Sequence, residues 1–192
     1  SKTYNLLTAA MFFPLGMLSS FAQKEPETVR AMFVDLYDES KDLQDRVSNF
    51  MFQADELHKR NMKFGLWFEP EMVSRESEFY KEHPDWCIHI PGVDAKEIRN
   101  QLVLDLSRTE VVDEITKRIT EVIQTYDISY VKWDMNRSIT DNGAEWLPAY
   151  RQNEQAHRHM LGVYALMERI TKKFPQVFFE GCASGGGRND FG

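Results

Sequence analysis

Residues 107–134 read SRTEVVDEITKRITEVIQTYDISYVKWD, and this stretch decides the fold class. Its first part places apolar residues at steps of three and four, which predicts a helix with one buried face. Ser107 and Glu110 have the spacing of a capping box, so we expect the helix to start there. The following run, 128–133, is short and mostly apolar, which is typical of a strand buried on both faces. The helix positions on the predicted buried face are Val111, Val112, Ile115, Ile119, Val122 and Ile123.

The same alternation of strands and helices extends on both sides of this stretch. It indicates an α/β fold in which helices cover a parallel sheet, either a barrel or a doubly wound sheet. A complete (β/α)8 barrel takes roughly 250 residues. Only four or five units are visible, so we expect a partial barrel. Further strands are predicted at 32–37, 63–68, 102–106 and 177–179, and further helices after Ser40, at 76–82 and at 151–174.

Composition narrows the class of protein. The chain has 192 residues, of which 42% are hydrophobic and 28% charged, as in ordinary soluble domains. Its net charge of -7 argues against a nucleic-acid partner, because phosphate binding needs a basic face. The two cysteines, Cys87 and Cys182, have neither zinc-site spacing nor a disulfide framework, which fits a cytoplasmic location.

An apolar run at residues 6–18 superficially mimics a secretory signal. It is too short to span a bilayer, and Pro14 and Gly16 interrupt it. We therefore favour a helix or loop buried against the core, and we expect no membrane partner.

Acidic residues stand at the ends of four predicted strands. The carboxyl ends of parallel barrel strands face one side of the molecule, where active sites form. A charged group there costs desolvation energy unless it has a partner or a function. We therefore expect a polar site built from Glu69 and Glu71, Asp105, Asp134 and Glu180.

Position 134 is the strongest candidate for a reactive group. Residues two apart on a strand point to the same side, so Lys132, Asp134 and Asn136 are expected to share a pocket. A nearby ammonium lowers the pKa of an aspartate and keeps it ionised, as a carboxylate nucleophile requires. Asn136 suits a ligand rich in hydroxyls. On spacing alone, a structural Lys–Asp ion pair explains the pattern equally well.

Aromatic and glycine-rich segments accompany these carboxylates. Trp67, Trp86 and Trp133 lie in or beside the strand ends, where an indole can stack on a sugar, although core packing is the commoner use. The glycines within 180–188 permit close backbone approach to a ligand. This segment lacks the Lys-Ser/Thr ending of a phosphate-binding loop.

Five motifs in the same order resemble family 36 glycoside hydrolases, the α-galactosidases. The similarity runs from about residue 57 to the C-terminus. The motifs are Met62-Lys-Phe-Gly-Leu-Trp-Phe-Glu-Pro-Glu-Met72, His83-Pro-Asp-Trp86, Arg99-Asn-Gln-Leu-Val-Leu-Asp105, Tyr130-Val-Lys-Trp-Asp-Met-Asn-Arg137 and Glu180-Gly-Cys-Ala-Ser-Gly-Gly-Gly-Arg188.

The resemblance implies a TIM-type (β/α)8 barrel and retaining hydrolysis of terminal α-galactosides such as melibiose and raffinose. It implies a covalent galactosyl-aspartate intermediate with Asp134 as nucleophile, and neither metal nor cofactor. A galactose-containing oligosaccharide is the expected partner. Family members often form homo-oligomers, so an oligomer is expected only of the full-length protein. The positions that match substrate-binding residues of the family are Lys132, Asn136, Arg99, Cys182, Gly185 and Trp67.

Two departures from the family pattern shape the expected domains. The acid/base aspartate of the family lies beyond Gly192, so we expect this chain to be nearly inactive by itself. The Asp-Asp-Gly-Trp motif of an earlier strand is missing, with 32–38 in roughly its place. We accordingly divide the chain into a divergent N-terminal segment, 1–56, and a partial catalytic barrel, 57–192.

Two other functions remain open at this point. One is a non-catalytic carbohydrate-binding fragment that keeps part of the sugar pocket. The other is a magnesium-dependent barrel enzyme in which Asp105, Asp134 and Glu180 bind the metal from successive strand ends.

Overall fold

The computed structural model describes residues 54–183. Residues 54–59 are helical and form the end of the helix predicted after Ser40. The strand predicted at 32–37 and the glycine-rich run that contains Gly185 lie outside the described residues.

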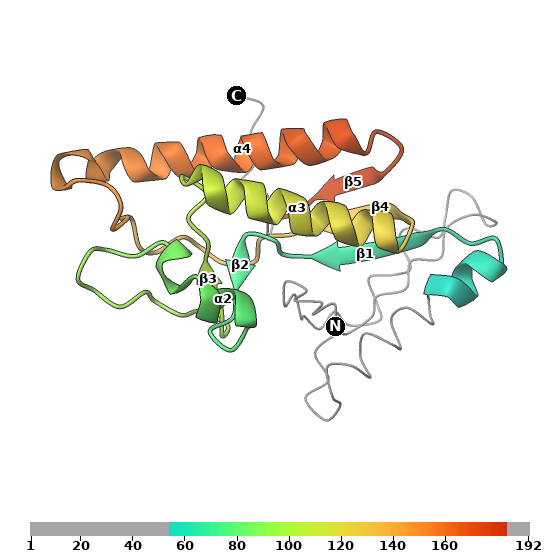
Figure 1. The fold of residues 1–192 in the computed structure, drawn as a ribbon, viewed down its shortest axis with the longest axis horizontal. Coiled ribbons are helices and arrows are strands. Elements are labelled where there is room, and N and C mark those ends of the chain that lie inside the picture. The colour runs from blue at the N-terminus through green and yellow to red at the C-terminus, as the bar shows by residue number, and fades with distance from the viewer. Residues whose placement is uncertain (1–53, 184–192) are drawn as a thin grey trace.

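Three parallel strands form the main sheet, in the order β1-β4-β5 (Figure 1). They are β1 (Phe64–Phe68), β4 (Ile128–Trp133) and β5 (Phe178–Gly181). β4 has the bounds that its apolar run predicts, and the other two strands lie within two residues of their predicted limits. The prediction of an α/β fold with parallel strands is confirmed.

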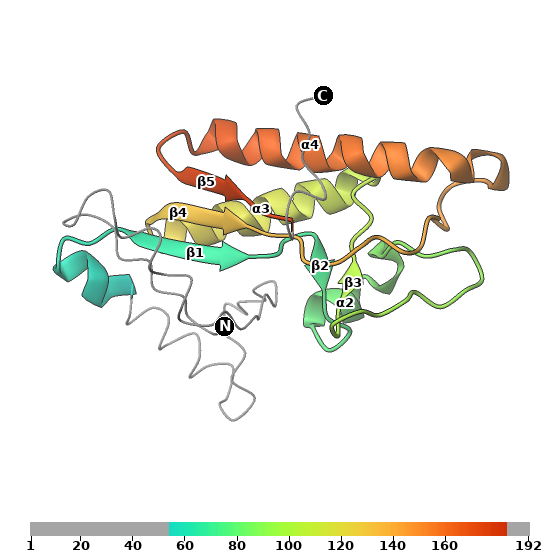
Figure 2. The same cartoon turned by 180° about the vertical axis from the view of Figure 1, so that it is seen from behind.

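Two long helices lie side by side on one face of this sheet. α3 (Thr109–Thr125) connects back to β4, and α4 (Gln155–Lys173) connects β4 to β5 (Figure 1). Figure 2 shows the opposite face of the three strands. Each strand is thus followed by a helix that leads to the next strand of the sheet, with both helices on the same side.

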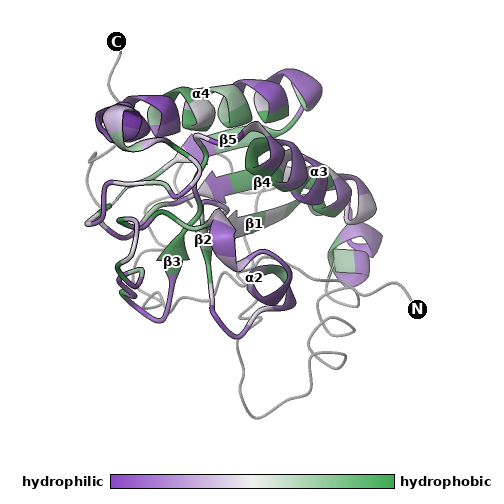
Figure 3. Ribbon diagram, turned by 60° about the vertical axis from the view of Figure 1, so that its left-hand side comes forward, coloured by the Kyte–Doolittle hydropathy of each residue, from purple (hydrophilic) through white to green (hydrophobic). Residues whose placement is uncertain are grey.

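The core fills the layer between the sheet and these two helices. Their apolar stripes face inward and their polar faces outward (Figure 3). Every predicted apolar position of α3 is buried except Val122, which is partly buried. Gly162 permits the close approach of α4, because a Cβ there would lie 1.7 Å from the backbone oxygen of Leu106.

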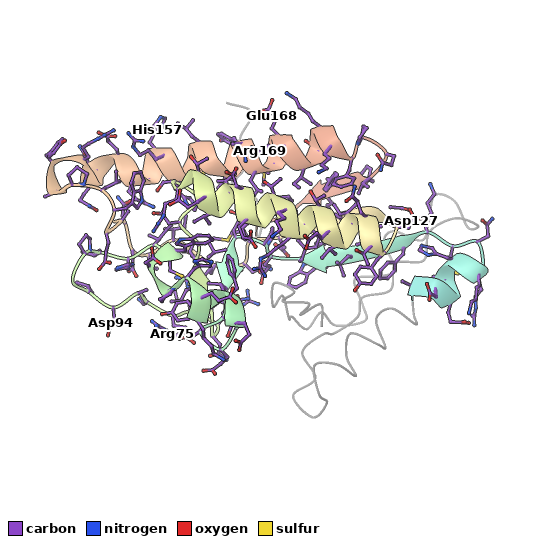
Figure 4. All side chains as sticks on the ribbon, in the orientation of Figure 1. Arg75, Asp94, Asp127, His157, Glu168 and Arg169 are labelled. Atoms are coloured by element: carbon purple, nitrogen blue, oxygen red, sulfur yellow. The ribbon has the colours of Figure 1, made fainter. Side chains whose placement is uncertain are left out.

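The outer faces of the helices carry charges. Figure 4 shows His157 and Glu168 projecting from α4 away from the sheet. Arg169 of α4 reaches Asp113 of α3, with 2.5 Å between Nη1 and Oδ1. This ion pair joins the two helices at the surface, where such a pair contributes at most about 1 kcal/mol.

The segment of sequence between β1 and α3 forms a separate two-stranded antiparallel sheet. It pairs β2 (Met72–Val73) with β3 (Leu102–Val103), and α2 (Glu78–Glu82) and the 3-10 helix η2 (Pro84–Trp86) lie between them in sequence. The prediction that 102–106 forms a strand of the parallel sheet is therefore wrong. A short apolar run shows that a segment is buried but not which sheet it joins.

Two helix starts also differ from prediction. α3 begins after Arg108, whose side chain pairs with Glu110, while Ser107 donates its hydroxyl hydrogen bond to Asp105. The capping box does not form, because the helix begins one residue later and the two side chains bond Asp105 and Arg108 instead. The helix predicted at 151–174 begins as a 3-10 helix, η3 (Ala149–Glu154), before α4.

Candidate active site

On the face of the parallel sheet opposite the helices, residues that are register partners place their side chains next to one another across the strands. Trp67 lies beside Lys132, and Lys132 lies beside Glu180. One row further along the strands, the next residues on this face are Glu69 and Asp134. The intervening residues, such as Val131 and Trp133, point to the helices and are buried in the core.

Gly65 and Tyr130 form an earlier row on the same face. A Cβ on Gly65 would lie 2.9 Å from Cδ1 of Tyr130, so the glycine makes room for the tyrosine ring. The ring stacks on Phe178, with centroids 5.8 Å apart, and its hydroxyl donates a hydrogen bond to Glu180. Burial, then this bond, raises the pKa of Tyr130. Tyr130 thus contacts Glu180, the ion-pair partner of Lys132.

Asp134 is held by hydrogen-bond donors on both carboxylate oxygens. Nε1 of Trp67 donates to Oδ2 over 2.9 Å, and the backbone N–H of Met135 donates to Oδ1 over 2.9 Å. The Asp134 backbone N–H bonds the Phe68 carbonyl over 3.0 Å, which continues the β1–β4 ladder past the strand end. The carboxylate is therefore fixed in position at the carboxyl end of β4.

The pKa of Asp134 is lowered from its usual value. Burial alone would raise the pKa, but hydrogen bonds from Trp67, Asn136, Cys182 and the Met135 amide outweigh it. The predicted direction is confirmed, but the groups that lower the pKa most are these neutral donors rather than the Lys132 ammonium. An ionised carboxylate is thereby favoured at neutral pH.

Lys132 forms an ion pair with Glu180, with 3.6 Å between Nζ and Oε1. Both side chains are only partly exposed, at 17% and 26%. The two residues are register partners on neighbouring strands, which brings their side chains together. Lys132 and Asp134 lie on the same face of β4, as predicted, and Lys132 pairs with Glu180 on the neighbouring strand.

Asp134 itself has no exposed surface, at 0% relative exposure. Asn136 and Cys182 beside it are partly buried. The Asp134 carboxylate is thus buried within the cluster of polar side chains that surrounds it.

Glu69 is a second buried carboxylate in this cluster, at 1% exposure. Its Oε1 accepts a hydrogen bond of 3.0 Å from the backbone N–H of Asn136. Burial raises the pKa of Glu69, the bonds from Asn136 and the charge of Arg99 oppose the rise, and Asp134 adds to it. The sequence shows that Glu69 follows an apolar strand. This pattern alone does not distinguish a structural carboxylate from one that takes part in the site.

Arg99 reaches the site from a tight turn. Arg99 and Asn100 have φ angles of 59° and 58°, and Ile98 and Gln101 exchange two backbone hydrogen bonds of 3.1 Å. This is a two-residue hairpin turn of the kind that favours Asn-Gly. Nη1 of Arg99 donates to the Asn136 carbonyl over 2.9 Å. An arginine in this left-handed conformation is strained, which is a frequent feature of functional sites.

Arg137 also bonds the loop that contains this turn. Its guanidinium donates to the backbone carbonyls of Gln101, over 2.5 Å, and Lys96, over 3.3 Å. The loop that carries Arg99 is thus tied to the segment after β4 by two arginines in opposite directions. The sequence gives no sign of this arrangement, since both arginines bond to backbone atoms.

Asp105 does not belong to this cluster, contrary to expectation. It follows β3 in the antiparallel sheet and accepts hydrogen bonds from Trp146 Nε1, over 3.0 Å, and Gln155 Nε2, over 3.2 Å. The proposed metal set of Asp105, Asp134 and Glu180 therefore does not form. Within residues 54–183, no three histidine, cysteine or acidic side chains gather as a metal site.

The structure brings together five of the predicted site residues around Asp134: Trp67, Arg99, Lys132, Asn136 and Cys182. Trp86 stacks on His83 and packs against the core instead, with ring centroids 3.7 Å apart. None of the helices within the described range is long and apolar enough to cross a membrane.

The fold and the site together define a class of α/β protein whose polar site gathers at the carboxyl ends of parallel strands. Comparison with known sequences then gives the family. The family model described as Melibiase matches residues 24–192, and the chain belongs to this family. The match includes residues 24–56, which precede the five motifs.

Named relatives agree with this membership. The chain is 52% identical over 139 residues to "Alpha-galactosidase AgaA" of Geobacillus stearothermophilus, and 49% identical over 139 residues to "Alpha-galactosidase Mel36A" of Lactobacillus acidophilus. Each alignment covers 72% of this chain and 19% of the relative. The chain thus spans about a fifth of the length of these enzymes.

Solved structures show the same likeness in three dimensions. The crystal structure of the Geobacillus stearothermophilus enzyme AgaA, described as a GH36 α-galactosidase, matches with a TM-score of 0.67 over 70% of this chain and 19% of that one. An α-galactosidase from Lactobacillus brevis matches with a TM-score of 0.71 at 46% identity, over 76% of this chain and 20% of that one. Variants of AgaA have been solved in complex with stachyose and with raffinose.

Proposed function

We propose that this chain is part of the catalytic domain of a retaining α-galactosidase in which Asp134 is the nucleophile. The observation that carries the proposal is the fixed, ionised carboxylate of Asp134, bonded by Trp67 and Met135 at the end of a parallel strand. Membership of the Melibiase family and the α-galactosidase relatives support the reaction class.

We infer that the three parallel strands are one sector of a (β/α)8 barrel. Successive strands are neighbours in the sheet, and α3 and α4 lie on one face of it. A doubly wound sheet would reverse its strand order and place helices on both faces. The partial catalytic domain would then comprise residues 57–192, preceded by a divergent N-terminal segment, 1–56.

The chemistry follows from the geometry at Asp134. Its carboxylate oxygen attacks the anomeric carbon of a terminal α-galactoside, while a carboxylic acid protonates the leaving oxygen. Water then hydrolyses the galactosyl-aspartate ester and releases galactose, and the anomeric carbon keeps the α configuration of the substrate. The second carboxyl group must stand roughly 5–5.5 Å from Asp134. We assign no residue of this chain to that group.

The polar groups around Asp134 supply the sugar contacts. The Lys132 ammonium and the Asn136 amide suit galactose hydroxyls, and Arg99 lies within the same cluster. Cys182 lies against Asp134 from the end of β5. The complexes of AgaA variants with stachyose and raffinose support galactose-containing oligosaccharides as substrates.

The test is hydrolysis of p-nitrophenyl α-galactoside by the full-length parent protein, followed by proton NMR of the sugar first released. We expect α-galactose as the first anomer and no loss of activity in EDTA. Release of β-galactose first would contradict a retaining mechanism. Sugar binding without turnover by the parent would instead favour the non-catalytic carbohydrate-binding function.

A further inference from the structure

The loop of residues 88–100 carries Arg99, and it lies against the segment that follows β4. Next to the hairpin turn, Nη1 of Arg99 donates to the Asn136 carbonyl, which joins the two segments at the site. They touch again near the start of the loop, where a Cβ on Gly143 would lie 2.8 Å from the backbone oxygen of His89. The position of Arg99 therefore depends on contacts at both ends of this loop.

His89 forms the polar contact at this second place. Its Nδ1 lies 2.9 Å from the carbonyl oxygen of Cys87, and its Nε2 lies 3.2 Å from Oε1 of Glu145. A carbonyl and an ionised carboxylate can only accept hydrogen bonds, and a neutral imidazole has a single N–H. Only the imidazolium, which carries a proton on each ring nitrogen, can donate to both partners at once.

The surroundings of His89 favour this protonated form. Burial of the ring lowers its pKa, but the bonds to the Cys87 carbonyl and the Glu145 carboxylate raise it. The negative charges that face the ring, Glu145 from the segment after β4 and Asp105 from the segment after β3, raise it further, so the pKa lies above its usual value of 6.5. This contact titrates near neutral pH, whereas the guanidinium of Arg99 keeps its charge throughout that range.

The backbone around Glu145 is fixed by other bonds. The side chain of Gln152, in η3, donates to the carbonyl oxygens of Ala144 over 2.8 Å and of Leu147 over 2.6 Å, and accepts from the Ala144 N–H over 3.0 Å. The Leu147 N–H bonds the Ala144 carbonyl over 3.1 Å and closes the turn. The bond from His89 to Glu145 thus ties the loop to a turn that is itself held in place.

We propose that protonated His89 is a positioning residue that fastens the loop carrying Arg99 to the Glu145 turn, and that loss of its proton loosens this loop. The inference rests on the proposed α-galactosidase function, in which Arg99 contacts galactose. Below pH 6.5 the ring is protonated and both bonds are made, and one bond is lost as the pH rises through the raised pKa. Because Arg99 binds the sugar and does not react with it, KM should rise while kcat changes little.

The experiment measures KM and kcat of the full-length parent on p-nitrophenyl α-galactoside from about pH 5.5 to 8.5, a range that spans histidine titration. His89→Gln does not titrate, so we expect its KM to exceed the wild-type KM by about three- to tenfold at low pH and to equal it at high pH. The ratio of the two KM values cancels the titration of other groups. His157→Gln is the matched control, because His157 projects from α4 away from the sheet (Figure 4), and its KM should equal the wild-type value at every pH.

Glu145→Gln tests the same contact from its other partner. It removes a negative charge that favours the proton on His89, so the rise of KM should move to lower pH. The Glu145 side chain is 56% exposed, so this variant should fold even if His89→Gln does not. A rise of KM at the wild-type pH in Glu145→Gln would contradict the proposal.

A KM ratio between His89→Gln and wild type that stays constant with pH would overturn the proposal, as would a fall in kcat with KM unchanged. A parent that does not cleave the substrate at all would refute the α-galactosidase function. A cleaving parent with a constant KM ratio would refute only the role of His89.

Discussion

The indole of Trp67 donates a hydrogen bond to the carboxylate of Asp134, with 2.9 Å between Nε1 and Oδ2. The two residues lie on neighbouring strands, 67 positions apart in sequence. The resemblance to the family implies a substrate-binding role for Trp67, and its contact in this structure is with Asp134, the proposed nucleophile. Its role is therefore electrostatic as well as steric, because an indole N–H stabilises the ionised form of the acid.

Trp67→Phe should raise the pKa of Asp134. The wild-type pKa is lowered, so activity that requires the ionised carboxylate is present above that pKa and lost as the pH falls through it. Loss of the indole donor moves this acid limb of kcat/KM to higher pH. The measurement is the pH profile of the full-length parent. Trp133→Phe is the control, since that indole bonds Glu71, and an unshifted limb in Trp67→Phe would contradict the assignment.

Comparison of Arg99→Asn with Arg99→Ala should distinguish the effect of backbone strain at position 99 on stability from the effect of the guanidinium on KM. The left-handed conformation at position 99 is more favourable for asparagine than for other side chains that bear a Cβ. We therefore expect Arg99→Asn to be more stable than Arg99→Ala by about 1 kcal/mol in denaturant unfolding. Both variants lack the guanidinium, so both should show a raised KM for the galactoside. Equal stabilities would show that the turn is not strained.

Cys182 and Cys87 should differ in reactivity. Burial raises the pKa of Cys87 to about 12, and its side chain is 3% exposed, whereas Cys182 is partly accessible beside Asp134. Iodoacetamide should therefore label Cys182 at least about tenfold faster than Cys87. Peptide mapping by mass spectrometry measures both rates in one sample. Galactose should slow the labelling of Cys182 alone, and no protection by galactose would place this thiol outside the sugar site.

The strands of the main sheet could be predicted from sequence because each is a short apolar run followed by a carboxylate. β4 shows this most clearly, since its bounds and its terminal Asp134 both follow from local pattern. The segment around Asp105 has the same pattern but belongs to the antiparallel sheet. Burial alone produces an apolar run, and the identity of the pairing partner depends on contacts distant in sequence.

The details of the site were less predictable for the same reason. Lys132 and Asp134 share a strand face as expected, yet Lys132 pairs with Glu180, which lies 48 positions later on the neighbouring strand β5. The donors that lower the pKa of Asp134 come from β1 and from beyond β5 as well as from its own segment. Such partners are determined by sheet register, which no local spacing encodes.

The central claim is that Asp134 forms the covalent bond to galactose. The direct test is Asp134→Gly in the full-length parent, assayed on p-nitrophenyl α-galactoside with and without sodium azide. We expect turnover to fall by about 10⁴-fold or more, and azide to restore release of p-nitrophenol by occupying the place of the carboxylate, with β-galactosyl azide as product. Turnover near the wild-type rate would contradict the claim, and so would an azide product of α configuration.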